Sequence, residues 1–227
     1  MEFLLKYTDL LLDGLWVTVT LLLISLIFGF VLAILVALAR LSKLKLIAYP
    51  AAFFTSVIRG TPLLVQIYIY YYGLGAVFSQ VPEIRSSFLW PYLRDGYWYI
   101  AFALIISTAG YLGEVIRSGL LAVPKGEVEA ARAFGMTGGK ALLRVRLPRA
   151  LYMLTPTLAG ETVLLLKSTA LASTIAVVDL LGAANRIRSI TFEIYQPLLL
   201  VAIIYLIMTA LIELGFRCIE KRNPVKS

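Results

Sequence analysis

The 227-residue sequence has no histidine and one cysteine, Cys218. A single cysteine excludes an internal disulfide, and without histidine the chain cannot build a Cys/His metal site or a histidine-dependent catalytic group. Charged residues are also scarce, at 15% of the chain, whereas soluble domains carry about 25%. We therefore expect no metal ion and no catalytic residue in this chain.

Apolar residues take the place of the missing charge. The chain is 60% hydrophobic, with a mean hydropathy of +0.89, well above the roughly 45–50% typical of soluble domains. The net charge of +8 is spread between apolar runs and does not form one basic face. The composition therefore predicts an integral membrane protein surrounded by lipid, not a nucleic-acid-binding protein. The first residues have neither a basic segment nor a small-residue cleavage site, so no removable signal peptide is expected.

Long apolar runs predict a single membrane domain, residues 1–227, with five helical crossings. About 20 helical residues cross a bilayer core of about 30 Å. The second crossing is interrupted by Arg59-Gly60-Thr61-Pro62, so it is expected to be kinked or in two parts, with Pro62 in the first turn of the second part. The expected spans cover about residues 14–39, 62–80, 97–121, 149–170 and 195–217.

The distribution of Lys and Arg predicts the topology. With five spans, fourteen of these residues lie on the side of the 124–148 loop and the C-terminus, and six lie on the opposite side. The positive-inside rule then places the loop and the C-terminus in the cytoplasm and the N-terminus outside. A sixth crossing would move the basic tail outside, so residues 171–190 are expected to form a re-entrant or external helix.

The 124–148 loop is a polar, basic interruption with the alanine spacing of a short amphipathic helix. It has the composition of an ordinary surface loop, but three features occur in a fixed order: Glu129-Ala130-Ala131, then Gly135, then Val145-Arg146-Leu147-Pro148. This order resembles the EAA loop of permease subunits from bacterial ABC importers, with Val145 in place of the usual isoleucine.

The resemblance implies that this loop is a coupling helix that docks onto a cytoplasmic ATPase. The residues that would couple the two chains are Glu129, Ala130, Ala131, Gly135 and Pro148. Small alanines permit close approach, a carboxylate offers a charge-assisted contact, and a glycine can end the helix. The stretch GMTGGKA lacks the spacing and the hydroxyl of a phosphate-binding loop. The chain is thus expected not to be an enzyme, with ATP and Mg²⁺ bound by the partner.

The resemblance extends over most of the chain. Residues 59–66 (RGTPLLVQ), 122–135 and 161–173 are similar to permeases for polar amino acids, in particular the M-type subunits of histidine/lysine/arginine/ornithine and of octopine and nopaline importers. This likeness implies an all-α fold of the MetI-like type in a bacterial inner membrane. It also implies a heterodimer with a Q-type permease, two ATPase subunits, a periplasmic binding protein, and a cargo of cationic amino acids or opines. One departure is Gly160, where such permeases often have asparagine.

Glu161 is the residue most expected to contact substrate. It lies 13 residues beyond Pro148, about 20 Å along a helix, where an ionisable group is costly and usually functional. Thr157 and Ser168 share its helical face. The full set of expected substrate-binding residues is Glu161, Gln66, Tyr70, Thr157, Ser168 and Thr169.

Several alternatives stay open at this point. Glu161 could instead form a structural pair with an arginine or with Lys167, although Lys167 lies about 240° around the helix and is a poor direct partner. Tyr70 could belong to an interfacial aromatic belt. Glu114 is expected to pair with Arg117 or Arg59. A proton-coupled secondary transporter, with Glu161 and Glu114 as proton carriers, is the alternative function.

Overall fold

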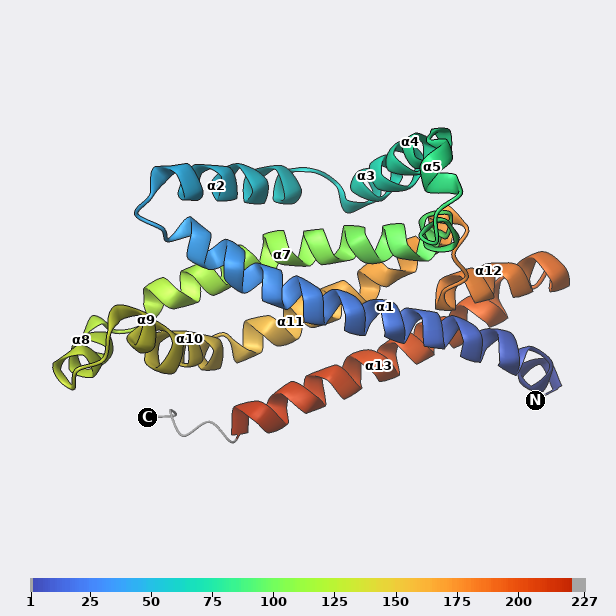
Figure 1. Ribbon diagram of the computed structural model, residues 1–227. Coiled ribbons are helices and arrows are strands. Elements are labelled where there is room, and N and C mark those ends of the chain that lie inside the picture. The colour runs from blue at the N-terminus through green and yellow to red at the C-terminus, as the bar shows by residue number, and fades with distance from the viewer. Residues whose placement is uncertain (1, 222–227) are drawn as a thin grey trace.

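The computed structural model describes residues 2–221, with side chains from residue 7 onward, and every regular element in that range is a helix (Figure 1). Lys6, Arg222 and Lys226, which contribute to the predicted charge bias, lie outside the described side chains. The α-helices are α1 (Glu2–Arg40), α2 (Lys45–Gly60), α3 (Leu63–Tyr68), α4 (Gly75–Gln80), α5 (Pro82–Arg85), α6 (Trp90–Leu93), α7 (Gly96–Ala122), α8 (Lys125–Ala133), α9 (Gly138–Ala141), α10 (Leu147–Met153), α11 (Thr155–Ser168), α12 (Leu180–Thr191) and α13 (Tyr195–Lys221). Two π-helical turns, η1 (Ile69–Leu74) and η2 (Leu142–Arg146), and one 3₁₀ turn, η3 (Thr169–Ile175), connect them.

Four segments of the described chain are long and apolar enough to cross a membrane singly: Tyr7–Arg40, Gly96–Ala122, Thr155–Ile175 and Tyr195–Lys221. The first has 34 residues, about 50 Å of helix, and so extends beyond a bilayer core of about 30 Å. The fourth expected span, 149–170, differs from the structure. A break at Leu154, just before Pro156, separates α10 from α11, so the straight crossing segment begins later than expected.

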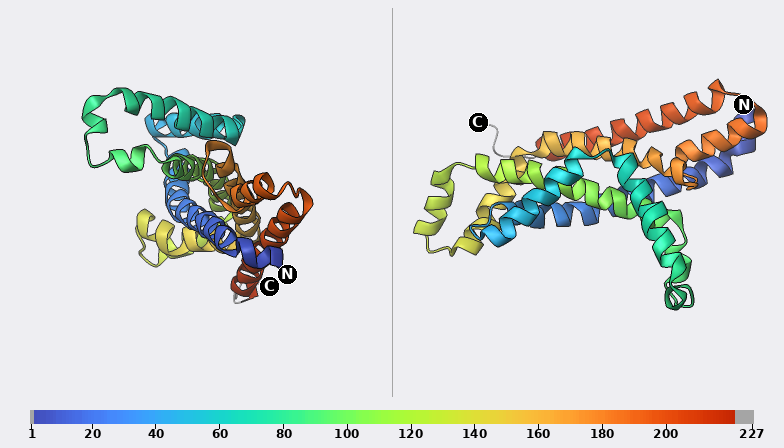
Figure 2. Two further views of the ribbon diagram at one scale, coloured as in Figure 1. Left: turned by 90° about the vertical axis from the view of Figure 1, so that its right-hand side faces the viewer. Right: turned by 90° about the horizontal axis from the view of Figure 1, so that it is seen from above.

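The remaining crossing is made of two parts. α2 and the α3–η1–α4 segment meet at an angle of 105° and qualify as one span only together. The expected span at 62–80 is therefore the second half of a bent pair, and Figure 2 shows it turning away from the bundle. The Gln66 side-chain amide donates to the Ile58 carbonyl at 2.9 Å and to the Thr61 carbonyl at 3.2 Å, so it bonds to backbone carbonyls that the end of α2 leaves without helical partners.

α1 and α7 form the central pair of the bundle and approach each other at glycines. A Cβ added at Gly29 would lie 2.6 Å from Thr108 Cβ, and one at Gly113 would lie 2.8 Å from Val36 Cγ1. Small residues allow backbones in a membrane to come close enough for extensive van der Waals contact. The buried residues between them include Ala33, Ala37, Leu104, Leu112 and Ile116.

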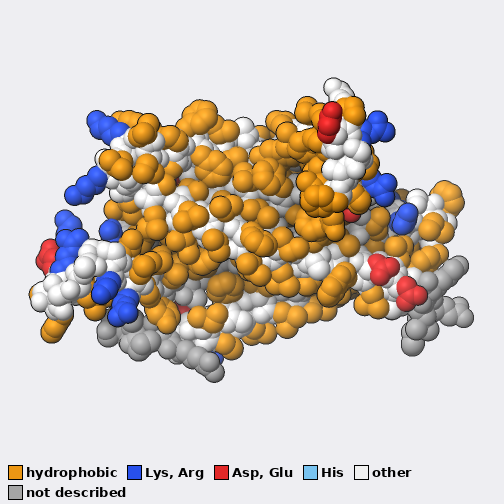
Figure 3. Space-filling model, in the orientation of Figure 1, with side chains coloured by type: hydrophobic (Ala, Val, Ile, Leu, Met, Phe, Trp, Pro, Cys, Tyr) orange, Lys and Arg blue, Asp and Glu red, His pale blue; other side chains and the backbone are white. Residues whose placement is uncertain are grey.

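The surface is apolar along the sides and charged at the two ends of the bundle (Figure 3). On α13, Leu199, Leu206 and Leu211 are each more than 60% exposed, as lipid-facing or subunit-facing residues are. The start of α1 and α12 lie toward one end, whereas α8, α9 and the end of α13 lie toward the other (Figure 1). The 124–148 loop and the end of α13 thus lie toward the same end of the bundle, and α12 is not among the candidate spans of the described chain. The assignment of that end to the cytoplasm stays a prediction.

Asp179 fixes the start of α12 against α1. Its side chain is fully buried, and its carboxylate accepts from the Gly182 amide at 2.9 Å and the Leu181 amide at 3.3 Å, an N-cap arrangement. The next amide, of Leu180, donates to Thr18 Oγ1 at 3.1 Å. Burial raises the pKa of Asp179 from 3.8 to about 6, although the two amides favour its charged form.

We expect the stability of the protein to fall as Asp179 ionises. Because the folded-state pKa of Asp179 is raised, its protonated form stabilises the folded protein. Its contribution to the free energy of unfolding, about 3 kcal/mol, is complete below about pH 4 and is lost as the pH rises through 6. Asp179→Asn keeps a capping side chain but removes the titration. Thermal unfolding midpoints in detergent between pH 4.5 and 7.5 should favour the variant increasingly toward pH 7.5. Parallel pH profiles for the two proteins would contradict this expectation.

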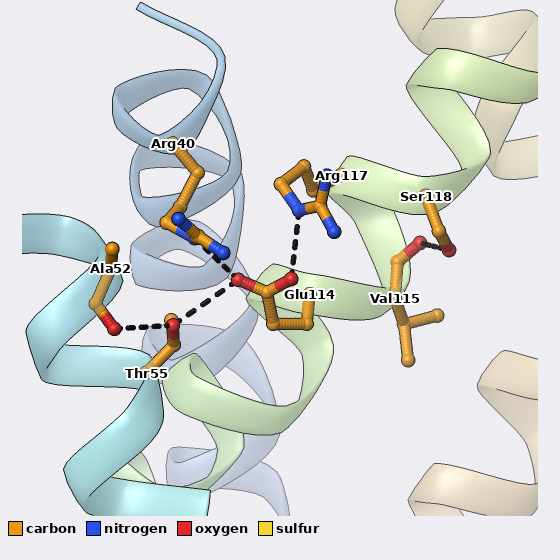
Figure 4. Close-up of polar contacts among 7 residues, drawn as sticks. All are labelled: Arg40, Ala52, Thr55, Glu114, Val115, Arg117 and Ser118. Carbon is orange, nitrogen blue, oxygen red and sulfur yellow. Dashed lines mark hydrogen bonds and ion pairs between the residues drawn. The ribbon is translucent and has the colours of Figure 1, made fainter. Parts of the chain in front are cut away.

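Glu114 on α7 joins three helices near the end that carries the 124–148 loop (Figure 4). Its carboxylate accepts from Arg40 Nε at 2.6 Å, Arg117 Nε at 2.7 Å and Thr55 Oγ1 at 3.2 Å. The predicted pairing with Arg117 is confirmed, whereas the alternative pairing with Arg59 is not observed. Arg40, 74 residues earlier, is the additional partner.

Replacing Glu114 by glutamine should leave two partly buried arginines without a counter-charge. Breaking a fully buried pair costs about 3–5 kcal/mol, and because the arginines are a quarter or more exposed we expect about 2–3 kcal/mol. The measurement is the unfolding midpoint in detergent. Glu213→Gln is the matched control, because it removes a surface pair with Arg217 at 3.5 Å that should be worth at most about 1 kcal/mol. Equal midpoints for the two variants would exclude a stabilising role of Glu114.

Candidate functional site

A cavity of about 250 Å³ lies between α1, α3, α7 and α11. Most of its wall is apolar, from Leu26, Leu63, Leu104, Leu112, Leu164 and Leu165. Its polar groups are Glu161 and the hydroxyl-bearing Ser107, Thr108, Tyr111, Thr162 and Ser168. An apolar cavity with a few convergent polar groups is the usual form of a small-molecule site.

Glu161 is the only acidic residue of this wall. It is half-buried, and no residue of the described chain forms an ion pair or hydrogen bond with its carboxylate. α11 can present a carboxylate here because it begins at Thr155-Pro156 and continues without a break to Ser168. The expectation that Glu161 forms a close structural pair with an arginine is therefore not met within the described residues.

A second, more open groove of about 630 Å³ lies between α11 and α13. Glu161 and Leu164 belong to both hollows, and Thr157 and Gly160 line only the groove. A Cβ at Gly160 would meet no atom within 4 Å, so its missing side chain leaves this wall open. Glu161 thus stands between two spaces that open on different sides of α11.

The structure brings together only some of the residues expected to bind substrate. Glu161 and Ser168 share the cavity, and Thr157 lies in the adjoining groove. Gln66, Tyr70 and Thr169 line neither space.

Each of these three contacts other parts of the chain. Gln66 bonds to the end of α2, and Tyr70 packs edge-on against Phe102 with ring centroids 5.1 Å apart. Thr169 is fully buried and donates to the Leu166 carbonyl at 2.7 Å. It lies where α11 changes into the 3₁₀ turn η3, so the helical periodicity that aligns Glu161 with Ser168 no longer applies.

Residues of α7 supply much of the cavity wall and were not identified from the sequence. Ser107, Thr108 and Tyr111 follow the three- and four-residue spacing of one helical face. That spacing was available in the sequence, but small hydroxyl residues are common in membrane helix interfaces, so the pattern alone does not indicate a cavity.

The 124–148 loop forms the compact helical unit that its alanine spacing predicts. α8 ends at Ala133, and Gly135 adopts φ +83°, so the expectation that this glycine terminates the helix is confirmed. Pro148 lies in the first turn of α10, where its missing N–H is not needed. Arg149 Nε donates to Glu127 Oε1 at 3.2 Å, which attaches α8 to α10.

The two alanines of the EAA sequence, which are neighbours on α8, differ in exposure. Ala131 is 7% exposed and packs against this chain, whereas Ala130 and Glu129 are exposed. Ala131 therefore packs α8 against the rest of this chain. Phe134, 88% exposed at the end of the helix, is the feature that sequence reasoning missed, although an aromatic residue in a polar segment was a visible signal.

An apolar helical bundle with a cavity between α1, α3, α7 and α11, and with a polar helical loop at one end, has the form of a membrane permease. The chain matches, over residues 10–223, the family described as binding-protein-dependent transport system inner membrane component, and it belongs to that family. The expected fold class is confirmed. Membership also places the chain in the inner membrane. The general class is therefore a permease of a binding-protein-dependent system, not a proton-coupled secondary transporter.

Individual relatives agree with this assignment. The chain is 42% identical over 210 residues to the octopine transport system permease protein OccM of Rhizobium radiobacter, covering 92% of this chain and 84% of the relative. It is 37% identical over 211 residues to the histidine/lysine/arginine/ornithine transport system permease protein HisM of Escherichia coli (strain K12), covering 92% and 87%. The crystal structure of an amino acid ABC transporter with histidines superposes with a TM-score of 0.82, at 33% identity and 97% coverage of both chains.

Proposed function

We propose that this permease subunit carries cationic amino acids or opines across the membrane and binds the positive charge of the cargo at Glu161. The observation that carries the proposal is a half-buried carboxylate, without an ion-pair partner in the described chain, in a largely apolar cavity. A charge in such a place is costly without a partner, and a cationic substrate supplies one. The substrates named for the relatives OccM and HisM are of this class.

The hydroxyl groups around Glu161 suit the donors of such a cargo. Ser107, Thr108 and Ser168 can accept hydrogen bonds from ammonium or guanidinium N–H groups, and the leucines of the wall can contact an aliphatic stem. The cavity at one side of α11 and the groove at the other give Glu161 two approaches. An alternating-access cycle would expose the carboxylate first to one approach and then to the other.

The energy for this cycle is proposed to come from other chains. In this proposal the complete importer contains this M-type subunit, a Q-type permease, two ATPase subunits that bind ATP and Mg²⁺, and a periplasmic binding protein. The exposed face of α8, with Glu129, Ala130 and Phe134, would dock onto one ATPase. This chain would contribute no catalytic group and no cofactor site.

Purification of the tagged chain from its native membrane tests the assembly. Recovery of a second permease and an ATPase, followed by ATP-dependent uptake of labelled arginine in proteoliposomes with the binding protein, is the expected result. Recovery of the chain with an ATPase but without a second permease would contradict the heterodimer. ATP-driven uptake of a neutral or acidic amino acid, but not of arginine, ornithine or octopine, would contradict the cargo.

A further inference from the structure

Arg59 is a second charge close to the cavity for which the fold gives no structural partner. It is the penultimate residue of α2, directly before the bend into α3, and it is exposed. Within residues 7–221 it forms no ion pair or side-chain hydrogen bond. Its guanidinium carbon lies 5.8 Å from the centre of the Tyr111 ring, and Tyr111 lines the cavity.

The position of Arg59 along the membrane makes an unpaired guanidinium costly. α2 carries Lys45 at its first residue, and Arg59 lies 14 residues further on, about 20 Å along the helix. Figure 1 shows the end of α2 about half-way along the bundle. A guanidinium at this depth needs an anion or water, and ionisable groups there usually mark a transport path.

Glu161 lines the cavity and Arg59 lies beside it, stacked on Tyr111, so two charges of opposite sign lie close to this space. The two groups form no ion pair. If they served only to neutralise each other, a direct contact would be the most favourable arrangement. A molecule that carries both charges would supply each group with the partner that the chain does not provide.

We propose that Arg59 binds the α-carboxylate of the cargo while Glu161 binds its cationic group, so that the cavity is a site for zwitterions. A guanidinium is the side chain best suited to a carboxylate, because two parallel N–H donors match its two oxygens. Stacking on Tyr111, which lines the cavity, holds the planar group beside that cavity. This inference rests on the proposed function, since it assigns the second end of the same cargo.

Arginine and agmatine separate the two ends of the site. Agmatine keeps the guanidinium and an amine but lacks the carboxylate, so it should use Glu161 and not Arg59. The experiment is equilibrium binding of each labelled compound to the detergent-purified permease–ATPase complex without the binding protein. The wild type should prefer arginine by about 10- to 100-fold, the range of one charge-assisted hydrogen-bonded pair.

Arg59→Gln should weaken arginine binding by about the same factor and leave agmatine binding within about threefold, while Arg59→Lys should retain part of the preference. Arg85→Gln is the matched control, because Arg85 also stacks on an aromatic ring, Trp90 at 5.9 Å, but that ring does not line the cavity. It should bind both compounds like the wild type.

Three results would overturn the inference. An equal loss of affinity for both compounds in Arg59→Gln would indicate that Arg59 has a structural role, and unchanged arginine binding would indicate that Arg59 does not bind the cargo. Equal affinity of the wild type for the two compounds would rule out the carboxylate site and leave the proposed function intact. Absence of binding of either compound to the wild type would instead reject the proposed cargo, and the zwitterion site with it.

Discussion

Glu161→Gln should reduce ATP-driven uptake of a cationic amino acid by about 10- to 100-fold. Glutamine keeps the size and a hydrogen-bonding oxygen of glutamate but removes the negative charge. A hydrogen bond to a charged group is worth about 1.5–3 kcal/mol, and each 1.4 kcal/mol corresponds to about tenfold in affinity or rate. Glu161 has no ion-pair partner among residues 7–221, so the substitution breaks no ion pair within that part of the chain.

The measurement is initial uptake of labelled arginine into proteoliposomes that contain the complete importer, with ATP inside and binding protein outside. The matched control is Glu83→Gln, which makes the same change at an exposed residue of α5 that lines neither the cavity nor the groove. It should transport at nearly the wild-type rate. Assembly with the ATPase should be unchanged in both variants, because neither residue lies in the 124–148 loop. Normal uptake by Glu161→Gln would reject this residue as the cation site.

Helical spans were predictable from the sequence because the bilayer imposes one strong constraint. Each crossing needs about 20 apolar residues whose backbone groups bond within the helix. α1, α7 and α13 satisfy it with uninterrupted runs, and the predicted bounds fall inside them. The second crossing was harder, because its 105° bend depends on how Gln66 bonds to the end of α2, which is tertiary information.

The site was only partly predictable because periodicity gives a face of a helix but not its neighbour. The shared face of Glu161 and Ser168 was correctly predicted and lines the cavity. Gln66 and Tyr70 also share a face, but that face packs inward against α2 and Phe102. Arg40 and Glu114 show the same limit, since nothing in a single sequence joins two charges 74 residues apart.

The 124–148 loop was predicted more completely than the cavity because its signals are local. Alanine spacing forms α8, and a glycine at positive φ ends it. Only the packing of α8 against the rest of the chain shows that Ala131 is buried and that Ala130 and Glu129 are exposed. Substitutions of the exposed residues therefore test docking, whereas a substitution of Ala131 also tests folding.

Glu129→Lys should uncouple the importer from its ATPase, with a loss of uptake of at least about tenfold. Glu129 is exposed on α8 and has no partner in the described part of the chain that the substitution would disrupt. A reversed charge at a docked interface replaces an attraction by a repulsion, which costs several kcal/mol when both groups are desolvated. Phe134→Ala should have a similar effect, because exposed aromatic residues are the commonest anchors of protein interfaces.

The measurement combines co-purification of the ATPase with the stimulation of ATP hydrolysis by substrate-loaded binding protein. Glu83→Lys is the matched control, since it makes the same charge change at an exposed residue of α5, which lies toward the end of the bundle opposite α8 (Figure 1). It should co-purify and respond like the wild type. Unfolding midpoints should be unchanged in Glu129→Lys, whereas Glu127→Lys should lower them because it breaks the contact with Arg149. A fully stimulated ATPase in complexes of both Glu129→Lys and Phe134→Ala would show that this face of α8 does not carry the coupling.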